Sequence, residues 1–324
     1  MTPFALLALA AAAPPPATAP ESFGFPPAAR VLRVPSSRAP LSVPPPPASD
    51  DAALRVAVLG EGPPVLLLPG LFGSAFGYRT LAPELAAAGF RAIALEPLGV
   101  GGSARPEGAD YSLAAQAARI AALLPALGAE RPVVVVHSAA AAIAFRLAAR
   151  HPERVAAIVS MEGGAPEQAA TAGFRRALTF APLIRLLGGR RLIRRQVRST
   201  LLGGAADKRW VTDEVVDGYM GAAAQDLGAA LRGYRRMANA REPEPLAPRL
   251  RDVRCPVRLL MGAVPHRGGP DEAEITRLRQ SLPTLVVQRL AGVGHYIYEE
   301  DPHAVVAAVR EVTDAALPRA APGP

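Results

Sequence analysis

The feature that most constrains the fold of this chain is the alternation of short apolar runs with longer stretches of helical composition. Continuous apolar runs are typical of strands buried on both faces of a parallel sheet, and four of them occur at residues 65–68, 91–95, 132–136 and 154–159. Helical stretches lie between them, at residues 78–89, 113–127 and 139–150. Strands and helices that alternate in this way form βαβ units, so the sequence predicts an α/β fold with a mostly parallel sheet.

The alternation breaks in the middle of the chain. Residues 163–246 are helical in composition and contain no convincing strand. Two strand-like runs and a closing amphipathic helix follow, at residues 257–261, 285–290 and 303–316. We therefore expect an α/β core interrupted by a helical cap inserted after the strand that ends near Glu162, with core residues 53–162 and 247–318 and cap residues 163–246.

The N-terminal segment allows two interpretations. Residues 1–13 are apolar and small residues follow them, as in a secretory signal peptide over residues 1–20, although no Lys or Arg precedes the run. The alternative is an Ala/Pro-rich tail on a cytoplasmic protein. The first interpretation predicts export to the periplasm or the medium. Residues 21–52 are rich in proline, which predicts a linker or a surface arm.

Composition excludes several classes of site. The net charge of +8 comes almost entirely from arginine, and the basic residues form no aromatic-interleaved stretch, so we expect no nucleic-acid partner. Cys255 is the only cysteine, which excludes an intramolecular disulfide. The five histidines show no metal-ligand spacing, so we expect neither metal nor cofactor. Nothing in the sequence indicates an oligomeric state.

Ser138 stands where an apolar strand runs into a helix. A tight turn at such a junction projects a serine hydroxyl from the sheet, where a base can activate it as a nucleophile. The turn requires small neighbours two residues to either side, and here these are Val136 and Ala140. The β-branched Val136 is expected to crowd the turn. Taken alone, the motif is equally consistent with a serine that caps a helix.

A second motif favours the catalytic interpretation. His295 follows the final strand-like run, and an imidazole on such a loop can approach a serine at the end of a central strand and exchange its proton near neutral pH. A third motif, at residues 66–74, ends a buried strand in Pro69-Gly70. The backbone N–H groups of Leu71 and Ala139 are the candidate oxyanion hole, which would stabilise the negative charge that develops on the substrate oxygen.

These motifs together resemble the α/β-hydrolase superfamily. The resemblance runs in order from about residue 53 to 318 and is carried by Pro69-Gly70, by Glu96-Pro-Leu-Gly-Val-Gly-Gly-Ser, by His137-Ser138-Ala139, and by Gly294-His295 with Glu300 and Pro302. It implies a hydrolase that acts on a small-molecule substrate without a cofactor. The family includes esterases, lipases, lactonases, C–C hydrolases, dehalogenases and epoxide hydrolases. Serine at the nucleophile position, in place of aspartate, argues against the last two.

The acid that completes a Ser-His-acid triad has two candidates. Most of the family places it after the strand that ends here at Gly262, but the residues that follow contain no acid before Asp271. Glu162, the favoured candidate, ends the strand after the nucleophile helix, a position that some α/β-hydrolases use. Either carboxylate would orient the imidazole and stabilise its cationic form. A Ser-His dyad without an acid is the third possibility.

The cap carries eight arginines and no carboxylate between residues 169 and 206, interleaved with apolar side chains. This pattern fits an ordinary cap helix with its arginines in water, or a peripheral contact with an anionic membrane. The leading functional prediction is a carboxylesterase-like serine hydrolase acting on an apolar ester. The alternatives are C–C or lactone hydrolysis with the same residues, and a catalytically silent binding domain, which Val136 and the displaced acid would explain.

Overall fold

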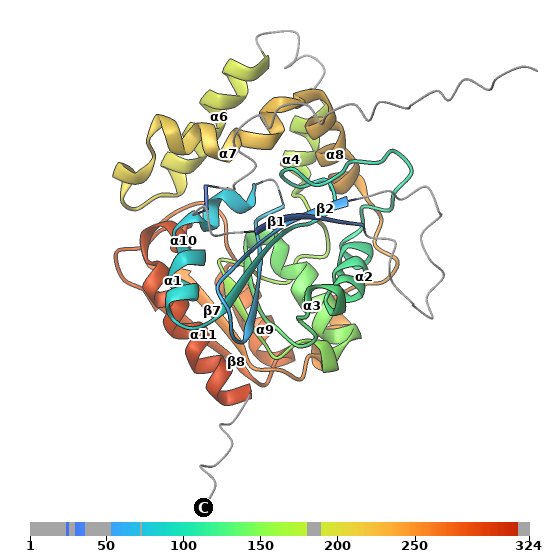
Figure 1. Cartoon of the computed structure of the whole chain (residues 1–324), viewed down its shortest axis with the longest axis vertical. Helices are drawn as coiled ribbons and strands as arrows, with labels where there is room; N and C mark the ends of the chain where they lie inside the picture. The colour runs from blue at the N-terminus through green and yellow to red at the C-terminus, as the bar shows by residue number, and fades with distance from the viewer. Residues whose placement is uncertain (1–23, 26–29, 36–52, 72, 180–188, 317–324) are drawn as a thin grey trace, which may run out of the picture.

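An eight-stranded sheet forms the centre of the molecule (Figure 1). The computed structural model describes residues 24–25, 30–35, 53–71, 73–179 and 189–316. The strand order is β1-β2-β4-β3-β5-β6-β7-β8; β2 is antiparallel to both of its neighbours, and all other pairs are parallel. The strands are β1 Arg30–Pro35, β2 Ala53–Leu59, β3 Pro64–Leu68, β4 Arg91–Glu96, β5 Val133–His137, β6 Ala157–Met161, β7 Val257–Gly262 and β8 Leu285–Leu290.

Two hydrophobic cores lie on the two faces of this sheet. Successive side chains of a strand point to opposite faces. Val134 and Val136 of β5 accordingly join one core with α2 (Leu113–Leu123), α3 (Ala141–Arg150) and α9 (Glu272–Ser281). Val133 and Val135 join the other core with α1 (Leu81–Ala87) and α11 (Pro302–Ala316). Both faces of the central strands are covered, which is why their sequences are continuous apolar runs.

The predicted helical cap is confirmed. After β6 the chain forms α4 (Ala172–Thr179), α6 (Gly189–Gly204), α7 (Asp213–Gln225) and α8 (Leu227–Asn239), and these helices lie together at one end of the molecule (Figure 1). The side chains of Thr212 and Asp226 accept hydrogen bonds from the first turns of α7 and α8, as N-cap residues do. Residues 163–179 and 189–246 contain no strand.

The N-terminal region differs in part from the expected linker. Residues 30–35 pair antiparallel with β2 and form the edge strand β1. The segment suggested to be a signal peptide lies outside the described residues. Within the described ranges, no helix has the length and apolar character needed to cross a membrane.

Candidate active site

Ser138 follows β5 directly, at the start of a short 3-10 helix, Ser138–Ala140, that leads into α3. Its φ angle is 51°, in the left-handed region that non-glycine residues rarely adopt. Such a sharp strand-to-helix turn projects the side chain beyond the end of the sheet. The end of β6 packs tightly beneath the turn, since a Cβ atom on Gly163 would lie 2.7 Å from the Ser138 carbonyl oxygen.

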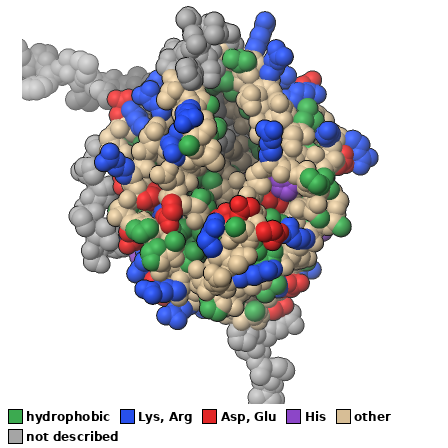
Figure 2. Space-filling view, turned by 180° about the vertical axis from the view of Figure 1, so that it is seen from behind, with side chains coloured by type: hydrophobic (Ala, Val, Ile, Leu, Met, Phe, Trp, Pro, Cys, Tyr) green, Lys and Arg blue, Asp and Glu red, His purple; other side chains and the backbone are tan. Residues whose placement is uncertain are grey.

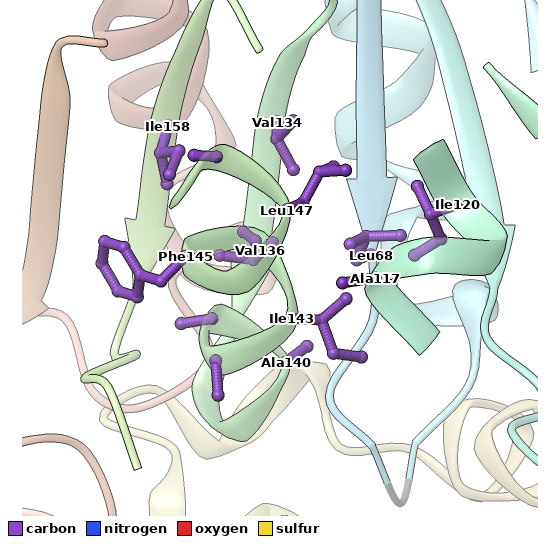
Figure 3. Packing of buried hydrophobic residues seen from close by; sticks show 14 of the residues in the cluster. Leu68, Ala117, Ile120, Val134, Val136, Ala140, Ile143, Phe145, Leu147 and Ile158 are labelled. Carbon is purple, nitrogen blue, oxygen red and sulfur yellow. The ribbon is translucent and has the colours of Figure 1, made fainter. Parts of the chain in front are cut away.

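Val136 does not prevent this turn from forming. Its side chain is fully buried in the core between the sheet and α3, together with Ala140 and Ile143 (Figure 3). The small Ala140 leaves room for this packing under the first turn of α3. The β-branched residue is therefore accommodated by the core.

His295 lies on the loop between β8 and the short helix α10 (Ile297–Glu300). Its backbone N–H donates to the carbonyl oxygen of Gly204 at the end of α6, and its carbonyl oxygen lies 3.1 Å from Nε2 of His137, the residue before Ser138. The imidazole rings of His137 and His295 meet edge to face, with centroids 4.6 Å apart. These contacts place the His295 imidazole beside the end of β5.

The electrostatics of His295 favour its neutral form. Burial, together with the nearby His137 and His266, lowers its pKa to about 2. Nδ1 of His295 is buried and has no hydrogen-bond partner. A neutral imidazole can accept a proton, and a carboxylate at Nδ1 would stabilise the cation that forms.

Glu162, at the end of β6, is the carboxylate closest to this requirement. Its φ angle is 54° and its side chain is fully buried. Oε1 accepts a hydrogen bond of 2.5 Å from the backbone N–H of Gly262, and Oε2 lies 3.1 Å from Nε2 of His266. Burial raises the pKa of Glu162, while Gly262, His266 and Arg289 oppose that rise.

The structure brings Glu162 to His295 and leaves Asp271 elsewhere. One oxygen of Glu162 and one ring nitrogen each from His266 and His295 lie within 4.8 Å of one another. Asp271 is exposed, and its carboxylate accepts the backbone N–H of Glu274 at 2.7 Å as the N-cap of α9.

His266 is the site residue that sequence reasoning missed. It lies on the loop after β7, the segment where the resemblance implies the acid, and a titratable side chain in that segment is the signal that could have identified it. With Glu162 and His295 it offers donor atoms of the types that zinc accepts. Two of these atoms, Nε2 of His266 and Oε2 of Glu162, are already in contact with each other at 3.1 Å.

The backbone around the candidate oxyanion hole is held by a buried carboxylate. Leu71 follows β3 and Ala139 follows β5. These two strands are parallel neighbours, so both N–H groups lie at the carboxyl ends of the central strands. Glu96, at the end of β4, accepts hydrogen bonds from the N–H groups of Ala75, at 2.9 Å, and Gly102, at 2.6 Å. It thereby ties the segment after Leu71 to the sheet.

Seen from behind, the surface is hollowed at the cap end of the molecule, and cationic side chains stand around the hollow (Figure 2).

Residues 63–188 match a family model described as the alpha/beta hydrolase fold. The strand order, the helical insertion after β6 and the turn at Ser138 agree with that match. The chain has the α/β-hydrolase fold.

Similar proteins with this fold carry several activities in their names. Epoxide hydrolase A of Mycobacterium tuberculosis is 37% identical over 111 residues, which are 33% of this chain and 34% of that protein. The chain thus aligns with about a third of that relative's length. A putative epoxide hydrolase from Pseudomonas aeruginosa is 25% identical, with a TM-score of 0.65 and 92% and 98% of the two chains covered. A thermophilic esterase from Thermogutta terrifontis is 20% identical, with a TM-score of 0.67 and coverages of 89% and 99%.

Proposed function

We propose that this α/β-hydrolase is a serine hydrolase that cleaves a carboxylic ester or a related acyl bond of a small apolar substrate. One observation carries the proposal: Ser138 occupies a left-handed turn at the end of β5, at the edge of the sheet where the Glu162 carboxylate and the His295 imidazole converge within 4.8 Å. A nucleophile, a base and an acid from three strand ends are the parts that acyl transfer requires.

The proposed reaction has two halves. The Ser138 hydroxyl oxygen attacks the ester carbonyl carbon while His295 accepts the hydroxyl proton, and the N–H groups of Leu71 and Ala139 stabilise the resulting oxyanion. The intermediate collapses, the C–O bond breaks, and His295 returns the proton to the leaving alcohol. Water then attacks the acyl-serine in the same way and releases the acid. Glu162 orients His295 and stabilises its cationic form throughout.

The identity of the nucleophile separates this reaction from epoxide hydrolysis, the activity named for some relatives. Attack of a serine oxygen on an epoxide carbon would leave a serine ether. An ether has no carbonyl carbon for water to attack, so the enzyme would be trapped. Acyl transfer leaves an ester, which water can hydrolyse. Ser138 therefore favours acyl substrates.

Two alternatives stand beside ester hydrolysis. Lactone or C–C hydrolysis would use the same residues. A catalytically silent binding domain would use none of them. We expect a fluorophosphonate probe to label the protein at Ser138, because the probe reacts with activated serines, and Ser138→Ala to abolish the labelling. A well-folded protein that is not labelled would overturn the proposed function. Comparison of p-nitrophenyl esters, lactones and C–C substrates then identifies the bond.

We also propose that the cap makes a peripheral contact with anionic membranes. Arg194 and Arg198 of α6 form ion pairs with Asp213 of α7. Arg191 and Arg195 of the same helix are exposed beside Leu192, whose side chain is 43% exposed. Cationic and apolar side chains on one helix suit an anionic lipid surface. Co-sedimentation with phosphatidylglycerol vesicles but not phosphatidylcholine vesicles, reduced in R191E/R195E, tests this contact. Equal binding to both vesicles would contradict it.

A further inference from the structure

On the side of β7, the carboxylate of Glu162 has one backbone hydrogen bond and one ion-pair contact. The Gly262 N–H bonds to Oε1, and Nε2 of His266 lies 3.1 Å from Oε2. Glu162 and Gly262 are 100 residues apart in the chain, and the pairing of β6 with β7 brings them together. His266 is the side chain that reaches this carboxylate, and its own side chain is only 8% exposed.

The contacts of His266 determine how many protons it shares with Glu162. Its Nδ1 lies 2.8 Å from the carbonyl oxygen of Val264, which can only accept, so Nδ1 carries a hydrogen. Its Nε2 faces the carboxylate. A contact of 3.1 Å between these two atoms is attractive only when a further proton lies on one of them. With that proton on nitrogen, the pair is an imidazolium and an ionised carboxylate; with the proton on oxygen, both groups are neutral.

The loop that carries His266 closes tightly over both Glu162 and His295. A Cβ atom on Gly268 would lie 2.9 Å from Cε1 of the His295 ring, and one on Gly269 would overlap Oε2 of Glu162. The φ angles of the two glycines are 98° and 78°, a region that side chains other than glycine rarely adopt. The two glycines allow the loop to pass this close to both side chains, and the His295 Nδ1 beside it is buried and has no hydrogen-bond partner.

We propose that His266 is a positioning residue for catalysis, which keeps the Glu162 carboxylate ionised and aimed at Nδ1 of His295. The inference rests on the proposed function, because it assigns His266 a role that acts through Glu162. The loop after β7 thus supplies the group that orients the acid, while the acid itself comes from the end of β6.

Glu162 needs a neighbouring group that stabilises its ionised form. Burial disfavours its charged form, and the charged or titratable groups that act on or lie beside it are His266, His295 and Arg289 on β8. A carboxyl group that holds its own proton cannot stabilise the His295 cation. Without His266, Glu162 would stay protonated up to a higher pH, and the rate would begin to rise only there.

The test is a double-mutant cycle on the purified full-length enzyme with a p-nitrophenyl ester. We expect His266→Ala to lower kcat by about 10- to 100-fold, the range seen when groups supporting a site residue are removed, with KM within about twofold. We expect the acidic limb of the pH–rate profile to move to higher pH. His266→Gln should recover part of kcat, because its amide still donates to Glu162. In the Glu162→Gln background, His266→Ala should cause no further loss, because the two residues act as a unit.

His303→Ala is the matched control, since the His303 side chain is 87% exposed on α11. Its kcat and pH profile should equal those of the wild type. The inference is overturned if His266→Ala keeps the wild-type kcat and pH profile, or if its loss adds fully to that of Glu162→Gln. If the alanine variant does not fold, the pH profile of His266→Gln is used instead. An acidic limb at the wild-type pH together with the wild-type kcat would then overturn the inference. Fluorophosphonate labelling of the wild type is scored separately, so failure of the proposed function is distinguishable from failure of this inference.

Discussion

Ser138 and Glu162 share a backbone conformation that no other non-glycine residue adopts within the described ranges. A residue held in the left-handed region costs about 1–3 kcal/mol and persists only where the surrounding structure determines it. Both residues directly follow central strands, and both belong to the proposed catalytic triad. The strained turns aim the two side chains at the site, because a regular continuation of β5 or β6 would point them elsewhere.

Glu162→Gln tests the acid with little change in shape. Its amide oxygen can still accept from Gly262, but the amide nitrogen cannot accept from an imidazole N–H. We expect kcat to fall by about 10³- to 10⁴-fold, the scale seen when a triad histidine loses its carboxylate. Since ionised Glu162 is the active form and burial raises its pKa, the wild-type rate should rise with pH above the usual carboxyl range.

The matched control for this change is Asp271→Asn, which alters the exposed cap of α9. It should retain kcat, because asparagine is also a good N-cap residue. If Asp271→Asn loses activity and Glu162→Gln does not, the assignment of the acid is wrong.

Gly269→Ala isolates the fit of the His266 loop. The new methyl group would overlap Oε2 of Glu162, so we expect a loss of kcat of about tenfold or more. Gly292→Ala carries a similar backbone strain, with φ at 75°, but has nothing within 4 Å of its Cβ position. Gly292→Ala should lose about 1 kcal/mol in urea unfolding from the backbone strain alone, and Gly269→Ala should lose more because of the overlap. Equal kcat values for both would contradict a close fit over Glu162.

At the scale of elements, one carboxylate joins the cap to the loop of His295, the proposed general base. Glu300 of α10 accepts hydrogen bonds from the N–H groups of Gly294, at 2.6 Å, and Ala206, at 2.7 Å, and from the indole of Trp210 at 3.2 Å. Ala206 follows α6, and Gly294 precedes His295. The end of the cap helix and the loop that carries His295 are therefore positioned by the same side chain.

Glu300→Ala should loosen this junction. Removing the shared acceptor leaves several N–H groups without their partner, and we expect the free energy of unfolding to fall by about 3 kcal/mol. Trp210 is the only tryptophan, so its fluorescence reports the junction directly. Glu311→Ala, at a carboxylate that is 55% exposed and paired with Arg258, should cost less than about 1 kcal/mol. Equal losses in the two variants would contradict the role of Glu300.

At the scale of the whole molecule, the buried polar residues beside the two apolar cores include two carboxylates, Glu96 and Glu162. Burial raises the pKa values of Glu96, Glu162 and Glu299, and N–H groups or cations oppose that rise at each of them. Glu96 is fully buried, with Arg55 3.8 Å away. These groups connect the strand ends and the cap at the cost of desolvation.

Glu96→Gln tests this cost through pH. A raised pKa means that the folded state binds the Glu96 proton more tightly, so wild-type stability from this group is present below the unfolded value and falls as pH rises through the folded value. Glutamine does not titrate. The free energy of unfolding of the wild type minus that of the variant should therefore become smaller from pH 4.5 to pH 7 in urea titrations. A difference that widens with pH would contradict the prediction.

Patterns within single elements determined much of this protein. Continuous apolar runs indicated the central strands, and stretches of helical composition between them indicated the flanking helices. The order of the strand-end motifs indicated the fold and singled out Ser138 and His295 as a nucleophile and a base to be tested. Each of these signals is local, because burial of a strand or one face of a helix is recorded in consecutive residues. The sequence also favoured Glu162 over Asp271 as the acid but left both open.

Contacts between distant segments were decided only by the tertiary structure. The pairing of β6 with β7 brings Glu162 to Gly262, and the loop after β7 then brings His266 to the same carboxylate. No local sequence pattern predicts these contacts of Glu162, because they depend on which strands are neighbours and on two glycines that let the loop close. The pairing of β1 with β2 is of the same kind. The proline-rich sequence predicted a linker or surface arm, and only the pairing with β2 shows that residues 30–35 form a strand whose backbone hydrogen bonds are satisfied.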